Sequence, residues 1–73
     1  RRIRRNLRRT EMSTARVNIY RDSIGTWCYA AWIDGEYDSS DTLGIGDVSE
    51  DEARDEALVQ FCEHETEVIR VAA

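Results

Sequence analysis

The 73-residue chain has no proline, no lysine, one histidine and two cysteines. Without proline no Pro-rich linker divides the chain, and its length is that of one small domain. Two cysteines are too few for a disulfide framework, so we expect Cys28 and Cys62 to be reduced thiols, although a bridge could form if the helix crosses the second strand. No apolar run approaches the roughly 18 residues of a membrane span, and no apolar stretch follows the basic start as in a secretory signal. We therefore expect a cytoplasmic protein with no membrane partner.

The short chain also argues against an enzyme. A domain of this size buries only about 60% of the surface of its unfolded chain, which leaves little room for a deep substrate pocket. Cys62 and His64 stand two residues apart, which is not a usual zinc spacing and points the two side chains in different directions on a helix. Asp51 and Asp55 share a helical face, but without a pocket they cannot enclose a substrate. The sequence predicts no catalytic residue, no metal site and no cofactor.

Charge divides the chain into two regions. Residues 1–11 hold six arginines and one acid, a net charge of +5, whereas residues 12–73 hold four arginines and fourteen acids, a net charge of −10. The predicted organisation is a basic arm over residues 1–11, helical or disordered, followed by a single acidic α+β domain over residues 12–73. A basic arm suits a polyanion, and an acidic body suits a cationic surface.

Residue alternation predicts two strands at the start of the body. Residues 15–20 alternate apolar and polar side chains with the period of a half-buried strand, and residues 22–25 have the composition of a turn. Residues 26–33 follow, with Trp27 on one face and Trp32 on the other. Because both faces of this second strand are apolar, we expect it to be central and covered on both sides.

Asp34 and Gly35 predict a two-residue hairpin turn, because both turn positions need a positive φ. The turn sets Trp32 opposite Tyr37 and begins a third strand that runs to Leu43. Strict alternation along that strand places Tyr37 and Leu43 on the Trp32 face. It places four polar side chains on the Trp27 face, namely Glu36, Asp38, Ser40 and Thr42.

Residues 49–52 (Ser-Glu-Asp-Glu) fit a capping box, in which the Ser49 hydroxyl accepts from a helical N–H and the Glu52 carboxylate accepts from the Ser49 N–H. We expect a helix from Ser49 to about Glu65. Its predicted apolar stripe is Ala53, Ala57, Leu58, Phe61 and Cys62. Residues 68–73 are apolar and β-branched and predict a fourth strand. The fold class is therefore α+β, a small antiparallel sheet of three or four strands with one helix on one face, in the order β-β-β-α-β.

Two segments of the body carry a family resemblance. Residues 20–22 (Tyr-Arg-Asp) lead to residues 25–27 (Gly-Thr-Trp), and residues 46–53 (Gly-Asp-Val-Ser-Glu-Asp-Glu-Ala) open the predicted helix. Over residues 15–72 this order resembles the small domain of HicB-type antitoxins, although the Pro-x-x-Pro-Gly-like segment of that family is missing. The resemblance implies an antitoxin that sits on a basic, RNA-cleaving toxin. The elements are also similar to the arm-site DNA-binding domains of phage integrases, whose sheet face is basic.

Acidic residues are the first functional candidates. Between Asp34 and Glu67 there are thirteen acids and one arginine. Such a surface can serve solubility alone, or reflect a salt-adapted proteome. It can also imitate the phosphates of a nucleic acid and bind a basic protein, with fast association that weakens in salt. The candidate partner-binding residues are Glu36, Asp38, Asp41, Glu50, Asp51, Asp55 and Glu56.

The basic arm and the aromatic residues provide the other candidates. The arm has the density of an arginine-rich nucleic-acid segment, although it can instead pair with the acidic helix of its own chain. Its candidate nucleic-acid-binding residues are Arg1, Arg2, Arg4, Arg5, Arg8 and Arg9. The hairpin aromatics are either core residues or interface anchors. If they are anchors, a homodimer through the sheet face that carries them is the simplest outcome. The candidate interface aromatics are Trp27, Trp32 and Tyr37.

The sequence thus favours a small non-enzymatic acidic binding protein that inhibits or regulates a basic nucleic-acid-handling protein. Antitoxins and phage anti-defence proteins that mimic nucleic acid are of this type. The expected partner is a basic nuclease, toxin or nucleoprotein complex. The alternatives are a nucleic-acid-binding protein that uses the arm, and a structural subunit of an assembly.

Overall fold

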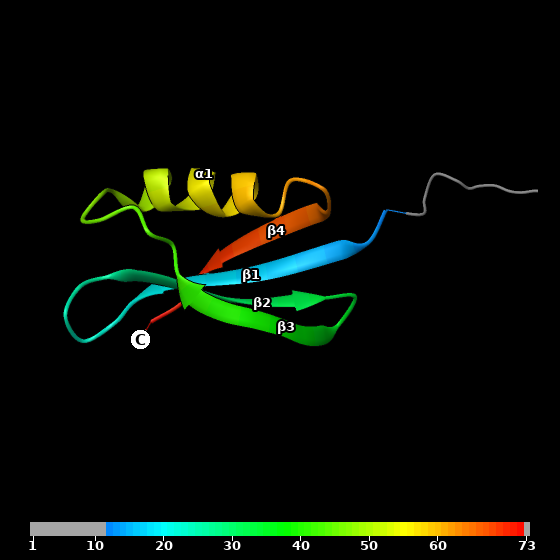
Figure 1. Ribbon diagram of the computed structural model, residues 1–73, viewed down its shortest axis with the longest axis horizontal. Helices are drawn as coiled ribbons and strands as arrows, with labels where there is room; N and C mark the ends of the chain where they lie inside the picture. Colours follow the sequence, from blue (N-terminus) through cyan, green and yellow to red (C-terminus); the bar gives the residue numbers. More distant parts are fainter. Residues whose placement is uncertain (1–11, 73) are drawn as a thin grey trace, which may run out of the picture.

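The fold is one sheet with one helix on it. The structure, a computed structural model, describes residues 12–72, so the basic arm predicted over residues 1–11 lies outside the described part. The elements are β1 (Thr14–Arg21), β2 (Trp27–Ile33), β3 (Glu36–Thr42), α1 (Glu50–Gln60) and β4 (Glu65–Arg70). The sheet has the order β3-β2-β1-β4, and α1 lies on one of its faces (Figure 1). The predicted α+β class and the order β-β-β-α-β are confirmed.

The sheet is mixed, because β4 pairs in parallel with β1 while β1–β2 and β2–β3 are antiparallel. The connection through α1 leads from one edge strand, β3, to the opposite edge strand, β4. A helix that crosses the sheet between two edges returns the chain in its starting direction, so β4 runs parallel to β3 and β1. The prediction of a wholly antiparallel sheet is therefore wrong for β4.

The hairpin between β2 and β3 has the predicted turn and an unpredicted bulge. Asp34 and Gly35 have φ values of 52° and 86°, and Trp32 pairs with Tyr37 as expected. The register then shifts by one residue, because Ala31 pairs with Ser39 and leaves Asp38 as an extra residue in β3.

This bulge reverses the alternation of β3 beyond Asp38. Ser40 and Thr42 lie opposite Ala30 and Cys28, on the Trp32 face and not on the predicted Trp27 face. Leu43 follows on the Trp27 side, where its side chain is only 4% exposed and its N–H donates to the Trp27 carbonyl. The predicted placement of these β3 side chains is therefore wrong for the residues that follow the bulge.

Helix α1 begins as predicted and ends early. The Ser49 hydroxyl accepts from the Glu52 N–H, and the Glu52 carboxylate accepts from the Ser49 N–H, which confirms the capping box. The helix ends at Gln60, and Phe61 turns its ring into the core at 8% exposure. The Thr66 hydroxyl donates to the Phe61 carbonyl, which satisfies a group that the helix end leaves free. As a result β4 begins at residue 65 and not at the predicted residue 68.

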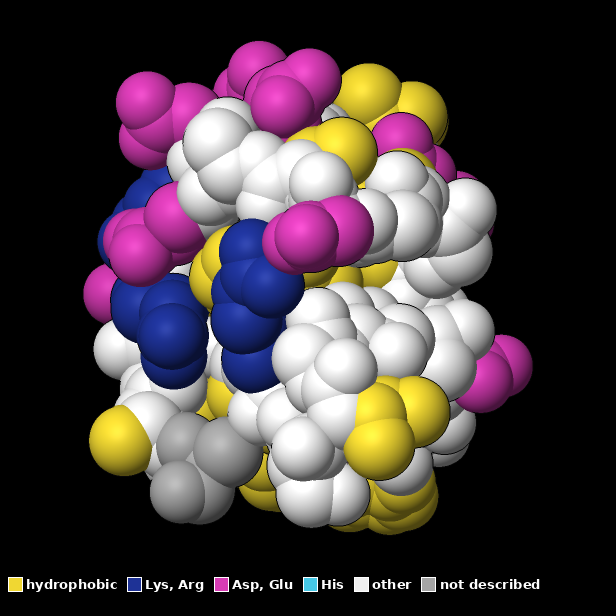
Figure 2. All heavy atoms as spheres, turned by 90° about the vertical axis from the view of Figure 1, so that its left-hand side faces the viewer, with side chains coloured by type: hydrophobic (Ala, Val, Ile, Leu, Met, Phe, Trp, Pro, Cys, Tyr) yellow, Lys and Arg dark blue, Asp and Glu magenta, His cyan; other side chains and the backbone are white. Residues whose placement is uncertain are grey.

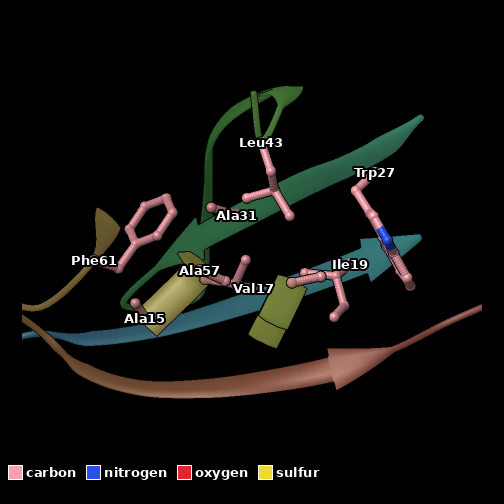
Figure 3. Close-up of a cluster of buried hydrophobic side chains, with 9 residues drawn as sticks. Ala15, Val17, Ile19, Trp27, Ala31, Leu43, Ala57 and Phe61 are labelled. Carbon is pink, nitrogen blue, oxygen red and sulfur yellow. The ribbon is translucent and has the colours of Figure 1, made fainter. Parts of the chain in front are cut away.

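The core lies between α1 and one face of the sheet (Figure 3). Alanines at positions 53 and 57 of the helix are fully buried, and their small side chains let α1 approach β1 and β4 closely. The other members of the core are Ala15, Val17, Ile19, Trp27, Ala31, Leu43 and Phe61. Leu58, 44% exposed, and the exposed Cys62 lie outside this core, so the predicted helical stripe is wrong at these two positions.

The opposite side of the sheet, here called the open face, has no helix or strand over it in the part of the chain that the structure describes (Figure 1). The strand registers assign its side chains. They are Thr14, Arg16, Asn18 and Tyr20 from β1, Cys28, Ala30 and Trp32 from β2, Tyr37, Ser40 and Thr42 from β3, and Glu65, Glu67 and Ile69 from β4.

Candidate functional site

Three of the arginines in the described part of the chain are engaged within the domain. The Arg21 guanidinium donates to Asp47 at 2.8 Å and to the Val48 carbonyl at 2.9 Å. Arg54 donates to Glu50 at 3.2 Å, and Arg70 lies 3.5 Å from the same carboxylate. These arginines gather at the end of the sheet below the start of α1, with acidic side chains above them (Figure 2). These three arginines are therefore paired with two carboxylates of the domain, Asp47 and Glu50.

Trp27 forms the centre of this arginine cluster. Its ring lies 4.6 Å from the Arg21 guanidinium carbon and 5.2 Å from that of Arg70, and its Nε1 donates to the Val48 carbonyl at 2.8 Å. The cation–π contacts and the hydrogen bond hold the β3–α1 loop against the sheet. At 2% exposure Trp27 belongs to the core, which removes it from the aromatic residues that a partner could reach.

The helical carboxylates beyond Glu50 have no such counter-charge. Among residues 12–72, ion pairs involve only Asp47 and Glu50 as acids. Glu52 serves the capping box, and Glu56 accepts a hydrogen bond from Gln60 at 3.0 Å, so the partners of both are uncharged groups. Asp55 is exposed in the middle of the helix. The solvent side of α1 therefore carries carboxylates without an ion-pair partner among residues 12–72.

Three of these carboxylates surround a hollow of about 320 Å³ between α1 and the β3–α1 loop. The rim is formed by Glu52, Asp55 and Glu56. The apolar side chains that line it are Ile45 and Val48 from the loop and Val59 from the helix. The half-buried Ile45 and Val48 pack against the core cluster, so their positions are fixed from below. We call this site the acidic hollow.

The predicted acidic residues fall into three groups. Asp55 and Glu56 line the acidic hollow, while Asp51 is exposed in the first helical turn and does not line it. Glu50 is held by two arginines. The β3 carboxylates, Glu36, Asp38 and Asp41, are exposed on an edge strand and lie outside the hollow. Of the predicted set, the structure thus brings only Asp55 and Glu56 together, and Glu52, which is not in that set, joins them.

Sequence reasoning missed the apolar half of the acidic hollow. Residues 44–47 (Gly-Ile-Gly-Asp) have the composition of a loop, and Val59 lies outside the predicted apolar stripe of the helix. Neither pattern shows that Ile45, Val48 and Val59 meet, because the loop is positioned by the distant contacts of Trp27 and Arg21 with the Val48 carbonyl. No local signal in the sequence encodes these contacts.

Trp32 and Tyr37 lie on the open face, away from the acidic hollow. Their rings form an edge-to-face pair with centroids 5.9 Å apart, and Tyr37 is 61% exposed. A second hollow, of about 360 Å³, lies beside them and is lined by Thr14, Arg16, Trp32, Gly35 and Glu67.

The cysteines and the histidine are not among the residues that line the acidic hollow. Cys28 and Cys62 are both free, and burial together with the nearby Asp22 carboxylate raises the pKa of the Cys28 thiol. The Ser13 hydroxyl lies 2.5 Å from His64 Nδ1, but among residues 12–72 no carboxylate binds the other ring nitrogen to complete a catalytic triad. The same residues contain no group of three metal-ligating side chains. They also contain no helix with the length and apolar character to cross a membrane.

In the part of the chain that the structure describes, the acidic hollow and the open face are our two candidate binding surfaces. Comparison of the chain with protein-family models, with curated proteins and with solved structures finds no match.

Proposed function

We propose that this protein is a small non-enzymatic binding protein whose acidic helix engages a basic, nucleic-acid-handling protein and inhibits or regulates it. The observation that carries the proposal is the acidic hollow. There, three carboxylates without an ion-pair partner among residues 12–72 line the same hollow as three apolar side chains. A face that serves solubility alone needs only the charges, whereas this site joins charge to a shaped apolar surface.

The chemistry of the hollow suits an arginine or lysine side chain. The aliphatic stem of such a side chain can lie on Ile45, Val48 and Val59. Its cationic head then reaches the rim, where the carboxylates Glu52, Asp55 and Glu56 accept hydrogen bonds. Asp51 and the β3 acids extend the negative field around the hollow and would speed association with a basic surface.

The resemblance to HicB-type antitoxins is in keeping with a basic toxin or nuclease as the partner. In this proposal the rows of carboxylates occupy the place of nucleic-acid phosphates on the partner's surface. The alternative function, nucleic-acid binding through Arg1, Arg2, Arg4, Arg5, Arg8 and Arg9, concerns residues outside the described part and enters as an outcome of the test.

A short oligoarginine peptide is a direct probe of the acidic hollow. We expect the full chain to bind it at low salt and to lose affinity as salt rises, and we expect Asp55→Asn/Glu56→Gln to weaken binding about tenfold. Glu63→Gln/Glu65→Gln removes the same charge away from the hollow and should change affinity about twofold or less. Isothermal calorimetry over a salt series measures both values.

Two results would contradict the proposal. Equal losses in the two double variants would show that only net charge matters and that the hollow is not a site. Binding of the full chain to a single-stranded oligonucleotide, with no binding to oligoarginine or to a basic ribonuclease, would favour the arm-based alternative.

A further inference from the structure

We propose that the open face is the contact surface between two copies of this chain. Among residues 12–72, a single helix covers the four-stranded sheet and no element lies over its other side, and a domain this small gains stability from covering that side. The side mixes polar residues with larger apolar and aromatic ones, namely Trp32, Tyr37, Tyr20 and Ile69. Tyr37 stands 61% exposed next to the hollow at Trp32.

The strand registers align these side chains in rows across the sheet. One row runs Tyr37, Trp32, Arg16, Glu67 from β3 to β4. Its two aromatic residues stand on the β3–β2 half, and its two charged residues stand on the β1–β4 half. The next row is Ser40, Ala30, Asn18, Ile69, and the third includes Thr42, Cys28 and Tyr20.

Consider a two-fold axis that lies above the open face, parallel to the strands and midway between β2 and β1. Rotation about this axis makes each row complementary to itself. It places β2 over β1 and β3 over β4 of the second copy. Trp32 then faces Arg16 of the second copy, a cation–π pair, and Tyr37 faces Glu67 of the second copy, a hydroxyl opposite an acceptor. In the other rows the small side chains of Ala30 and Cys28 face the larger ones of Asn18 and Tyr20.

The charge of the open face favours a second copy of the chain as its binding partner. The open face carries one arginine and two glutamates, Glu65 and Glu67, so its charge is nearly balanced. The helix side carries the uncompensated acids, and two copies would repel each other there. A nucleic acid would meet two carboxylates for one arginine on the open face, which makes it the poorer fit.

The size of the face sets the expected affinity. Four strands about 4.8 Å apart and about seven residues long give a footprint of roughly 400 Å² per copy. That is small for a protein interface, so we expect a concentration-dependent dimer with a dissociation constant on the order of 10 μM. The dimer leaves both acidic hollows on its outer sides, so it does not depend on the proposed function.

Sedimentation equilibrium of the full chain over a concentration series tests the dimer. We expect Tyr37→Glu to raise the dissociation constant at least about tenfold, because it sets a carboxylate at position 37 against Glu67 of the second copy. Adding Glu67→Arg should restore association to within about threefold of the original chain. Positions 37 and 67 lie on opposite edge strands, about 14 Å apart within one copy, so this rescue can arise only between copies.

The matched control is Tyr37→Glu with Asp55→Arg, which has the same net charge but places the arginine on α1. It should stay as weakly associated as Tyr37→Glu alone, and circular dichroism checks that every variant is folded. A full chain that remains monomeric at about 1 mM overturns the proposal. Equal rescue by Glu67→Arg and Asp55→Arg overturns it as well, because net charge alone would then explain association.

Discussion

The two faces of the sheet are built from the same strands, but one is buried under α1 and the other is not. On the helix side Ala15, Val17 and Ile19 are fully buried. On the open face their neighbours in β1 are Arg16, Asn18 and Tyr20, which are exposed or half-buried. The difference shows that β1, and not the aromatic β2, selects the face that the helix covers. Only β1 alternates sharply between apolar and polar side chains, whereas β2 is apolar on both sides and could accept the helix on either.

Replacing an isoleucine on each face gives the largest expected contrast. Ile19→Ala opens a cavity beneath α1 and should lower the free energy of unfolding by about 3 kcal/mol, a large share of the stability of so small a domain. Ile69→Ala on the neighbouring strand removes the same atoms from the open face and should cost about 1 kcal/mol or less.

Urea denaturation at low protein concentration measures both variants without a contribution from dimers. If Ile19→Ala does not fold, Ile19→Val, with an expected cost of about 1 kcal/mol, keeps the comparison measurable. Equal costs at positions 19 and 69 would mean that the open face is as well covered as the core.

The two tryptophans provide the second contrast. Trp27→Phe removes the hydrogen bond to the Val48 carbonyl and weakens the contacts with two arginines, so we expect a loss of about 2 kcal/mol. Trp32→Phe keeps an aromatic ring beside Tyr37 and should cost about 0.5 kcal/mol in the monomer. Thermal melts followed by circular dichroism give both values, and a larger loss at position 32 would reverse the assignment of Trp27 as the structural residue.

A polar atom on the open face gives the smallest of the three expected contrasts, and here the substitution should stabilise the protein. Asn18 Oδ1 is buried and has no hydrogen-bond partner among residues 12–72. Asn18→Val removes this unsatisfied acceptor and suits a strand better, so it should stabilise the monomer by about 1 kcal/mol. Asn18→Ser, which keeps a polar group, is the control. If Asn18→Val destabilises the protein and Asn18→Ser leaves its stability unchanged, a bound water satisfies the Asn18 amide.

Local chemistry predicted much of the fold. The Asp34–Gly35 turn, the pairing of Trp32 with Tyr37 and the Ser49–Glu52 capping box all depend on residues close in sequence, and all are present. Predictions failed where distant contacts compete with a local pattern. The bulge at Asp38 moves Leu43 to the core side, and Phe61 caps the end of the helix with its ring against Tyr29 of β2.

The candidate sites divide in the same way. The excess of acids on the helix can be predicted from the sequence. Polar positions outside the apolar stripe of an amphipathic helix face solvent, whichever surface the stripe packs against. The acidic hollow cannot be predicted from the sequence in this way. Part of its apolar lining comes from the β3–α1 loop, which is positioned by the hydrogen bonds of Trp27 and Arg21 to the Val48 carbonyl.

By itself, the sequence determined the element order, the turn types, the helix start and the separation of charge between residues 1–11 and the body, since propensities, caps and charges act over a few residues. Only the tertiary structure decided that β4 lies beside β1, that three arginines are engaged within the domain, and that Trp32 and Tyr37 remain on an open face. These features depend on which apolar surfaces meet. A small sheet with apolar residues on both sides offers more than one such choice until the helix occupies one of them.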